Sequence, residues 1–178
     1  MKAFAESTRW IGSWERLRFS FGVRGGEIVK TVYIEDVADA LEATMEEWNQ
    51  FLNTETGEVV SLPDGDLYGN WSDDDEKLAE AIDSSDVYVR LPSQHELREY
   101  DIMEDFADQV QNQRKAAILF RALNGRKPFR HFKDAINNLG IAEEYYAFRF
   151  LAFCVIAARW CRDNNIPYAY KDKQHGFN

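Results

Sequence analysis

A run of basic residues in an otherwise acidic chain is the feature of this sequence with the clearest chemical consequence. Between Gln109 and Lys133 the chain has seven Lys or Arg residues and no Asp or Glu. The densest part lies where a helix is predicted to begin, and there the backbone N–H groups are unpaired and the helix dipole is positive. Cations are unfavourable at such a position unless an anion neutralises them. The sequence therefore predicts a negative group close to this segment.

Helical spacing indicates which side chains would contact that anion. Arg126 and Arg130 are four residues apart and Lys133 follows three later, so one flank of the helix can present all three. Guanidinium groups suit carboxylates and phosphates because they form paired hydrogen bonds with them. The candidate anion- or partner-binding residues are Arg126, Lys127, Arg130, His131, Lys133 and Arg149.

The helix that carries the cations is predicted to run from Pro128 to Leu139 and to bury one apolar stripe. The members of this stripe are Phe129, Phe132, Ile136 and Leu139. Arg130, His131 and Lys133 must then lie beside or opposite the buried face.

Two sources of the neutralising charge stay open. The first is the chain itself, whose flanking segments contain Glu96, Glu99, Asp101, Glu104, Asp105, Asp108, Glu143 and Glu144. Pairing with these carboxylates is the simpler explanation and would make the basic segment a structural feature. The second is external: an anionic small molecule or an acidic protein surface.

Arg149 is a second unusual cation because it stands in the most apolar part of the chain. Apolar and aromatic residues precede and follow it from Tyr146 to Phe153. A buried charge without a partner costs several kcal/mol. We therefore expect an acidic side chain to pair with Arg149; the alternative is that it lines a pocket with Tyr145 or Tyr146.

Other patterns of functional residues favour structural explanations. No phosphate-binding loop, dinucleotide-binding glycine motif, nucleophile elbow or zinc-protease helix motif is present. The triple Asp from Asp73 to Asp75 follows Ser72 as the acidic first turn of a helix would. Cys154 and Cys161 lie about 10 Å apart on one predicted helix, too far for a disulfide, so we expect free thiols. We predict no metal and no cofactor.

Composition excludes several classes of protein. The formal net charge of -10 argues against general affinity for nucleic acids or anionic membranes. The longest apolar stretch, from Tyr145 to Ala158, is shorter than the roughly 18 residues of a membrane span. The first 28 residues lack the continuous apolar core of a secretion signal. These features favour a cytoplasmic location.

Hydrophobic periodicity predicts an α+β fold with a small antiparallel sheet and a helical C-terminal half. The expected strands are a hairpin of residues 50–53 and 58–62 and a further strand at 87–91. About five helices are expected besides the short one that opens at Ser72. They include one continuing from Ile34 to Trp48 and one opening with a capping box at Ser93 and Glu96. Three more cover residues 111–124, 128–139 and 143–164.

The predicted domain organisation is a single α+β domain over residues 29–166. Residues 1–28 are expected to be an extension, either a mis-annotated start or a flexible arm, because they are basic, aromatic and poorly patterned. Residues 167–178 are expected to be a frayed tail, because Pro167 ends the last helix.

Four segments together resemble the uncharacterised bacterial family UPF0158. They are D-V-Y-V-R-L-P-S (86–93), Y-D-I-M-E-D-F (100–106), F-R-H-F-K-D (129–134) and Y-Y-A-F-R (145–149). The resemblance covers residues 34–166, with Tyr145 at a position where the family commonly has Trp. It implies that Arg130, Lys133 and Arg149 belong to a family pattern, and it implies no activity.

The sequence thus favours a binding or regulatory domain whose basic cluster engages an anionic ligand or an acidic partner. Charge reversal at Arg130 and Lys133 is then expected to abolish binding and leave stability almost unchanged. Two alternatives stay open. One is a hydrolase or nucleotide-processing enzyme that uses carboxylates, and the other is an inhibitor whose acidic face, residues 73–108, mimics nucleic acid. The oligomeric state is unknown.

Overall fold

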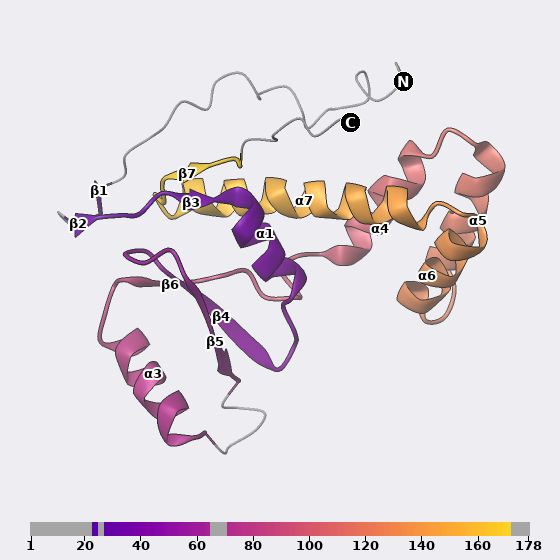
Figure 1. The fold of residues 1–178 in the computed structure, drawn as a ribbon. Coiled ribbons are helices and arrows are strands. Elements are labelled where there is room, and N and C mark those ends of the chain that lie inside the picture. Colours follow the sequence, from indigo (N-terminus) through magenta and orange to yellow (C-terminus); the bar gives the residue numbers. More distant parts are fainter. Residues whose placement is uncertain (1–22, 25–26, 65–70, 172–178) are drawn as a thin grey trace, which may run out of the picture. The chain divides into compact units, whose positions relative to one another are not determined.

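The computed structural model describes residues 23–24, 27–64 and 71–171 (Figure 1). The chain divides into two compact units, one that contains Arg98–Arg149 and one built from Phe19–Leu97 and Phe150–Asn178. We refer to them as the helical unit and the mixed unit and describe each within the described residues. None of the helices described there is long and apolar enough to cross a membrane.

The mixed unit contains a three-stranded antiparallel sheet of order β5-β4-β6. β4 (Trp48–Asn53) and β5 (Val59–Pro63) form the predicted hairpin, with Gln50 opposite Ser61, and β6 (Tyr88–Arg90) pairs with the other edge of β4. The turn is held by the Asn53 side chain, which accepts hydrogen bonds from the next backbone N–H groups, and by Gly57 at φ 74°. The predicted sheet is confirmed.

The first helix is shorter than predicted. α1 (Ile34–Glu42) buries the expected residues Ile34, Val37 and Leu41. The chain then turns and Trp48 opens β4, which leaves Met45 and Trp48 exposed at 59% and 42%. The apolar spacing continued across the turn by coincidence, and pairing of β4 with both of its neighbours overrode it.

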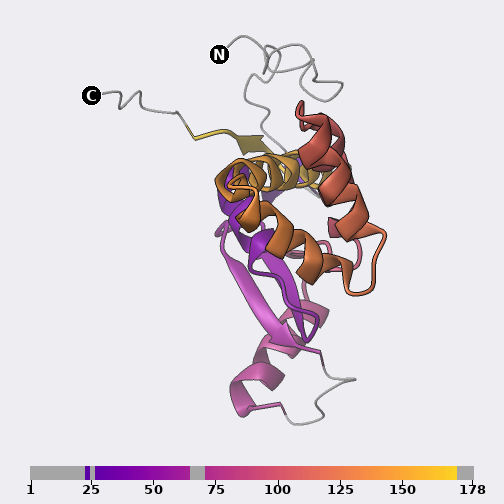
Figure 2. The same ribbon diagram turned by 90° about the vertical axis from the view of Figure 1, so that its right-hand side faces the viewer.

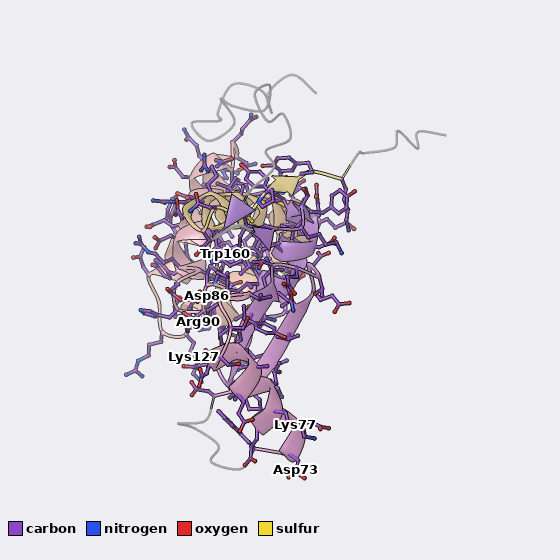
Figure 3. The ribbon with its side chains drawn as sticks, turned by 90° about the vertical axis from the view of Figure 1, so that its left-hand side faces the viewer. Asp73, Lys77, Asp86, Arg90, Lys127 and Trp160 are labelled. Carbon is purple, nitrogen blue, oxygen red and sulfur yellow. The ribbon has the colours of Figure 1, made fainter. Side chains whose placement is uncertain are left out.

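α3 (Asp73–Asp83) begins as predicted. The Ser72 hydroxyl accepts from the Asp75 backbone N–H, and the Asp75 carboxylate accepts from the Ser72 backbone N–H, which completes a capping box. No residue of α3 is buried. Asp73 and Lys77, labelled in Figure 3, lie on this exposed helix.

Part of the predicted frayed tail is ordered. β7 (Tyr168–Ala169) pairs in parallel with β3 (Val32–Tyr33), and the Lys171 backbone N–H donates to Glu35 over 3.0 Å. Lys171 also forms an ion pair with Asp36. The frayed-tail prediction is therefore corrected for residues 168–171, because long-range pairing supplied partners that no local pattern indicates; residues 172–178 lie outside the described part.

Little of the predicted N-terminal extension lies within the described residues. β1 (Val23–Arg24) and β2 (Glu27–Ile28) form an antiparallel pair. The rest of residues 1–28 lies outside the described part, so the prediction for that segment stays a prediction, as does that of a single domain over residues 29–166.

The helical unit packs four helical segments around an aromatic core. They are α4 (Glu99–Gln109), α5 (Gln113–Leu123), α6 (Pro128–Asn138) and the first part of α7 (Ala142–Asp163). The Tyr145 ring meets Phe106 and Phe132 edge to face, at centroid distances of 5.3 and 5.0 Å. Aliphatic residues of α4, α5 and α6 complete the core, and α5 and α6 lie side by side (Figure 2).

The start of α4 differs from the prediction. Ser93 and Glu96 do form reciprocal capping hydrogen bonds, but only one turn follows them. Arg98 adopts a left-handed conformation at φ 49°, and the helix begins at Glu99. The starts and ends of α5, α6 and α7 lie within two residues of those predicted, and the predicted α+β class with a helical C-terminal half is confirmed.

Candidate functional site

The predicted cations of the α5–α6 region are exposed and carry no ion pair. Exposed side chains include Arg126, Lys127, Arg130, His131 and Lys133. No carboxylate of the described residues lies within 4.0 Å of any of them. Two of the acids expected to neutralise them have other partners: Glu99 pairs with Arg149, and Asp101 pairs with Arg98 over 2.6 Å. In the described part of the chain, intramolecular pairing does not account for the basic segment.

Helix α6 is exposed on this side because its buried face is narrow. Phe132, Ala135 and Ile136 are buried, at a spacing that places them on one side of the helix. Phe129, predicted to be buried, is 45% exposed, so that prediction was wrong. It lies one turn before Lys133 on the same outer side, because residues four apart on a helix are neighbours. We call Phe129, Arg130 and Lys133 the outer face of α6.

The first turn of α6 contains no neutralising group. Pro128 occupies the first position, where its missing N–H and fixed φ are tolerated. Lys127 precedes it at φ 54° and provides no side-chain cap, and no acid is present in the turn. The predicted electrostatic conflict between a basic segment and a positive helix end is therefore present in the folded chain.

An open groove of about 500 Å³ runs between α5 and α6. Its lining residues are Ile118, Arg121, Ala122, Gly125, Arg126, His131, Asp134, Ala135, Asn138 and Leu139. The apolar members form a floor, and Arg121, Arg126 and His131 place positive or titratable groups at the rim. Asp134 is the only acid among the described residues that line the groove.

The groove separates the predicted cluster into two parts. Arg126 and His131 line it, whereas Lys127, Arg130 and Lys133 do not. On α6 the groove side holds His131, Asp134 and Asn138, spaced three and four residues apart. Arg130, one turn before Asp134, lies at the edge of this side, and Lys133 lies away from it. Of the three cations predicted to share one flank, Arg126 alone is part of the groove lining.

One groove cation was missing from the predicted site. Arg121 lies on α5 in a set with Ile118 and Ala122, at the spacing of one helix face. That spacing is visible in the sequence. The sequence does not show that this face of α5 meets α6. Another cation of the basic segment is structural, because the Lys115 ammonium donates to the Leu139 carbonyl over 3.0 Å at the end of α6.

Arg149 has the acidic partner that its apolar surroundings predicted. Its Nε lies 2.7 Å from Glu99 Oε1, and the two side chains are only 15% and 18% exposed. The neighbouring Tyr145 is fully buried, and its hydroxyl has no hydrogen-bond partner within the described residues. Burial, followed by the charge of Glu99, raises the pKa of Tyr145. We assign Arg149 to the architecture of the helical unit.

The other candidates have structural explanations. Asp74 pairs with Lys77 over 3.1 Å, and hydrogen bonds from Ser72 lower the pKa of Asp75. The described residues contain no group of three or more His, Cys, Asp or Glu side chains able to hold a metal ion. Cys154 and Cys161 are not joined in a disulfide, as predicted, and both are buried; burial raises the pKa of Cys161 to about 12.

Comparison with known proteins places the chain in a family. The model of an uncharacterised protein family, UPF0158, matches residues 30–175. Neither a curated protein nor a solved structure shows a significant match. The matched region contains both compact units for most of their length, including the α5–α6 groove and the Arg149–Glu99 pair. The chain therefore belongs to the uncharacterised protein family UPF0158.

Proposed function

We propose that this protein is an anion-binding domain, and that the α5–α6 groove receives the acidic groups of its ligand. The observation that carries the proposal is the set of exposed basic side chains at the groove, the cations Arg121 and Arg126 with His131 beside them, none with a carboxylate of the described residues within ion-pair distance. In a chain with a net charge of -10, this is a local concentration of positive charge.

These exposed cations contribute little to the stability of the fold. Exposed charges contribute only about 0–1 kcal/mol even when they are paired. Arg126, two residues before the first residue of α6, lies near the positive end of the helix dipole, an interaction that is unfavourable by about 0.3–1 kcal/mol. An anion bound in the groove would relieve this unfavourable interaction. Ligand binding therefore explains the exposed basic segment, which the stability of the fold does not.

The outer-face cations have a secondary part in the proposal. Arg130 and Lys133, together with Lys127, raise the positive potential around the groove and draw an anionic ligand towards it. Such long-range attraction is screened by salt within about 10 Å at 0.1 M ionic strength. Direct contacts inside the groove are screened less.

Binding of a fluorescein-labelled oligoglutamate, followed by fluorescence anisotropy at low ionic strength, tests the proposal. The double variant Arg121→Glu/Arg126→Glu reverses two groove cations. The matched control Arg130→Glu/Lys133→Glu makes the same change in net charge on the outer face. We expect the groove variant to lose at least about tenfold in affinity, equivalent to about 1.4 kcal/mol, and the control to lose about two- to threefold. Absence of binding by the wild type, or equal losses in the two variants, would refute a specific groove site.

A further inference from the structure

We propose that the ligand of the α5–α6 groove is an acidic amphipathic helix of a partner protein, an inference that rests on the proposed function. Such a helix would lay its apolar face on the groove floor and direct its carboxylates to the cations at the rim. The charge of the groove specifies only that its ligand is anionic. Its apolar lining adds the class of partner.

The apolar lining of the groove, which we call its floor, consists of Ile118, Ala122, Ala135 and Leu139. Ala122 and Ala135 are small residues, and Leu139 is half-buried between solvent and core. Ile118 lies beside them with 42% of its surface exposed, although it is a large aliphatic side chain. A ligand that offered only charge would leave this apolar surface in water, whereas an apolar face would bury it.

The length of the groove matches two turns of a helix. On α6 its lining extends from His131 to Asn138, eight residues with a rise of about 10 Å at 1.5 Å per residue. Residues i, i+3, i+4 and i+7 of a bound helix span the same length, and this is the spacing by which amphipathic helices enter hydrophobic grooves. The α5 and α6 helices form the two sides, and the connection at Gly125 and Arg126 closes one end.

The charges of the rim determine which kind of helix fits. Arg121 and Arg126 lie near the start of α6, and His131 is one turn into it. Acidic residues on the flanks of a bound helix would face these groups, and a basic helix would be repelled by them. Asp134 lies further along the groove, so that end favours an uncharged or hydrogen-bond-donating side chain on the partner.

Two labelled peptides of identical composition test this inference. Both have about 15 residues, the length at which an isolated helix begins to be stable, and consist mainly of Glu, Ala and Leu. In the first, Leu residues recur at i, i+3, i+4 and i+7; in the second, the same residues are permuted so that no apolar face forms. We expect the first peptide to bind the full-length protein at least about tenfold more tightly than the second.

A substitution in the floor provides the matching variant. Ile118→Ser is expected to weaken binding of the amphipathic peptide about fivefold and to leave oligoglutamate binding unchanged. The control is Leu151→Ser, which alters another exposed aliphatic side chain, 40% exposed, that does not line the groove. It should affect neither ligand.

The outcomes separate this inference from the proposed function. If both peptides and oligoglutamate bind equally, the partner is recognised by charge alone; the helix proposal is then wrong and the anion site stands. Failure of all three ligands to bind overturns both. If the amphipathic peptide binds more tightly but Ile118→Ser has no effect, its apolar face lies elsewhere and the inference about the groove floor is overturned.

Discussion

The helical unit uses cations in two contrasting ways. Arg149 is mostly buried and forms an ion pair with Glu99 at 2.7 Å, whereas Arg121 and Arg126 lie exposed at a groove with no carboxylate of the described residues in reach. A buried charge must have a partner for the unit to fold. An exposed charge is solvated and imposes no such requirement. The first cation therefore serves stability, and the second pair is the one that we propose serves binding.

The largest expected effect comes from breaking the buried pair. Glu99→Gln removes the carboxylate that Arg149 contacts, and we expect it to lower the free energy of unfolding by about 3 kcal/mol. The control, Glu104→Gln, removes an exposed carboxylate from the same helix and should change stability by less than about 0.5 kcal/mol. Urea unfolding at pH 7 measures both, and equal midpoints would contradict a structural role for the pair.

Tyr145→Phe is expected to have a smaller effect of the opposite sign. The Tyr145 hydroxyl is buried without a hydrogen-bond partner among the described residues, so removing it should stabilise the protein by about 1 kcal/mol. A loss of stability instead would mean that the hydroxyl supports the neighbouring Arg149–Glu99 pair.

Tyr145→Phe should also change how the free energy of unfolding depends on pH. Because folding raises the pKa of Tyr145, its proton is held more tightly in the folded than in the unfolded chain. Below the unfolded pKa of about 10 Tyr145 is protonated in both states and does not change stability with pH; as the pH rises above it, deprotonation favours the unfolded chain and stability falls. Wild-type stability should fall more steeply above pH 10 than that of Tyr145→Phe, which urea midpoints across this range would measure. Parallel profiles would contradict the shift.

The smallest expected effect concerns the exposed region. Lys127 adopts φ 54°, a left-handed conformation that costs a non-glycine residue about 1–2 kcal/mol. After allowing for the greater freedom of glycine in the unfolded chain, Lys127→Gly should stabilise the protein by about 0.5 kcal/mol. Arg126→Gly, at a position without positive φ, should be neutral or destabilising. Thermal unfolding compares the two, and destabilisation by Lys127→Gly would show that the lysine side chain supports the fold.

Local signals in the sequence were sufficient for most element boundaries. Ser72 as a cap, Pro128 as the first residue of α6 and Gly140 at φ 64° all act within one turn, and each marks the boundary it predicted. The sequence also predicted that Arg149 pairs with an acidic side chain, because a charge in an apolar segment requires a partner of opposite charge. Its identity as Glu99, fifty residues away, depends on how α4 and α7 pack.

The remaining features depend on tertiary contacts. The spacing of Phe129 is compatible with a place inside the buried stripe of α6 or at the edge of that stripe. Only the packing of α5 against α6 determines which of the two places Phe129 has. The same packing brings Arg121 to the groove, whose lining includes Arg126 and not Arg130. Pairing of β3 with β7 joins residues 136 positions apart, such as Val32 and Tyr168, and no local pattern contains that information.

The most direct test of the contrast is thermal unfolding of the wild type and of Arg121→Glu/Arg126→Glu, with and without the amphipathic acidic peptide. Without peptide, we expect free energies of unfolding that agree within about 0.5 kcal/mol, because the cost of reversing Arg121 in the last turn of α5 is offset by the gain from an acid before the first turn of α6. Peptide in large excess over its Kd should raise the melting temperature of the wild type only, since a ligand stabilises the state that binds it. A groove variant that is markedly less stable without peptide, or that is stabilised by peptide as much as the wild type, would contradict the account.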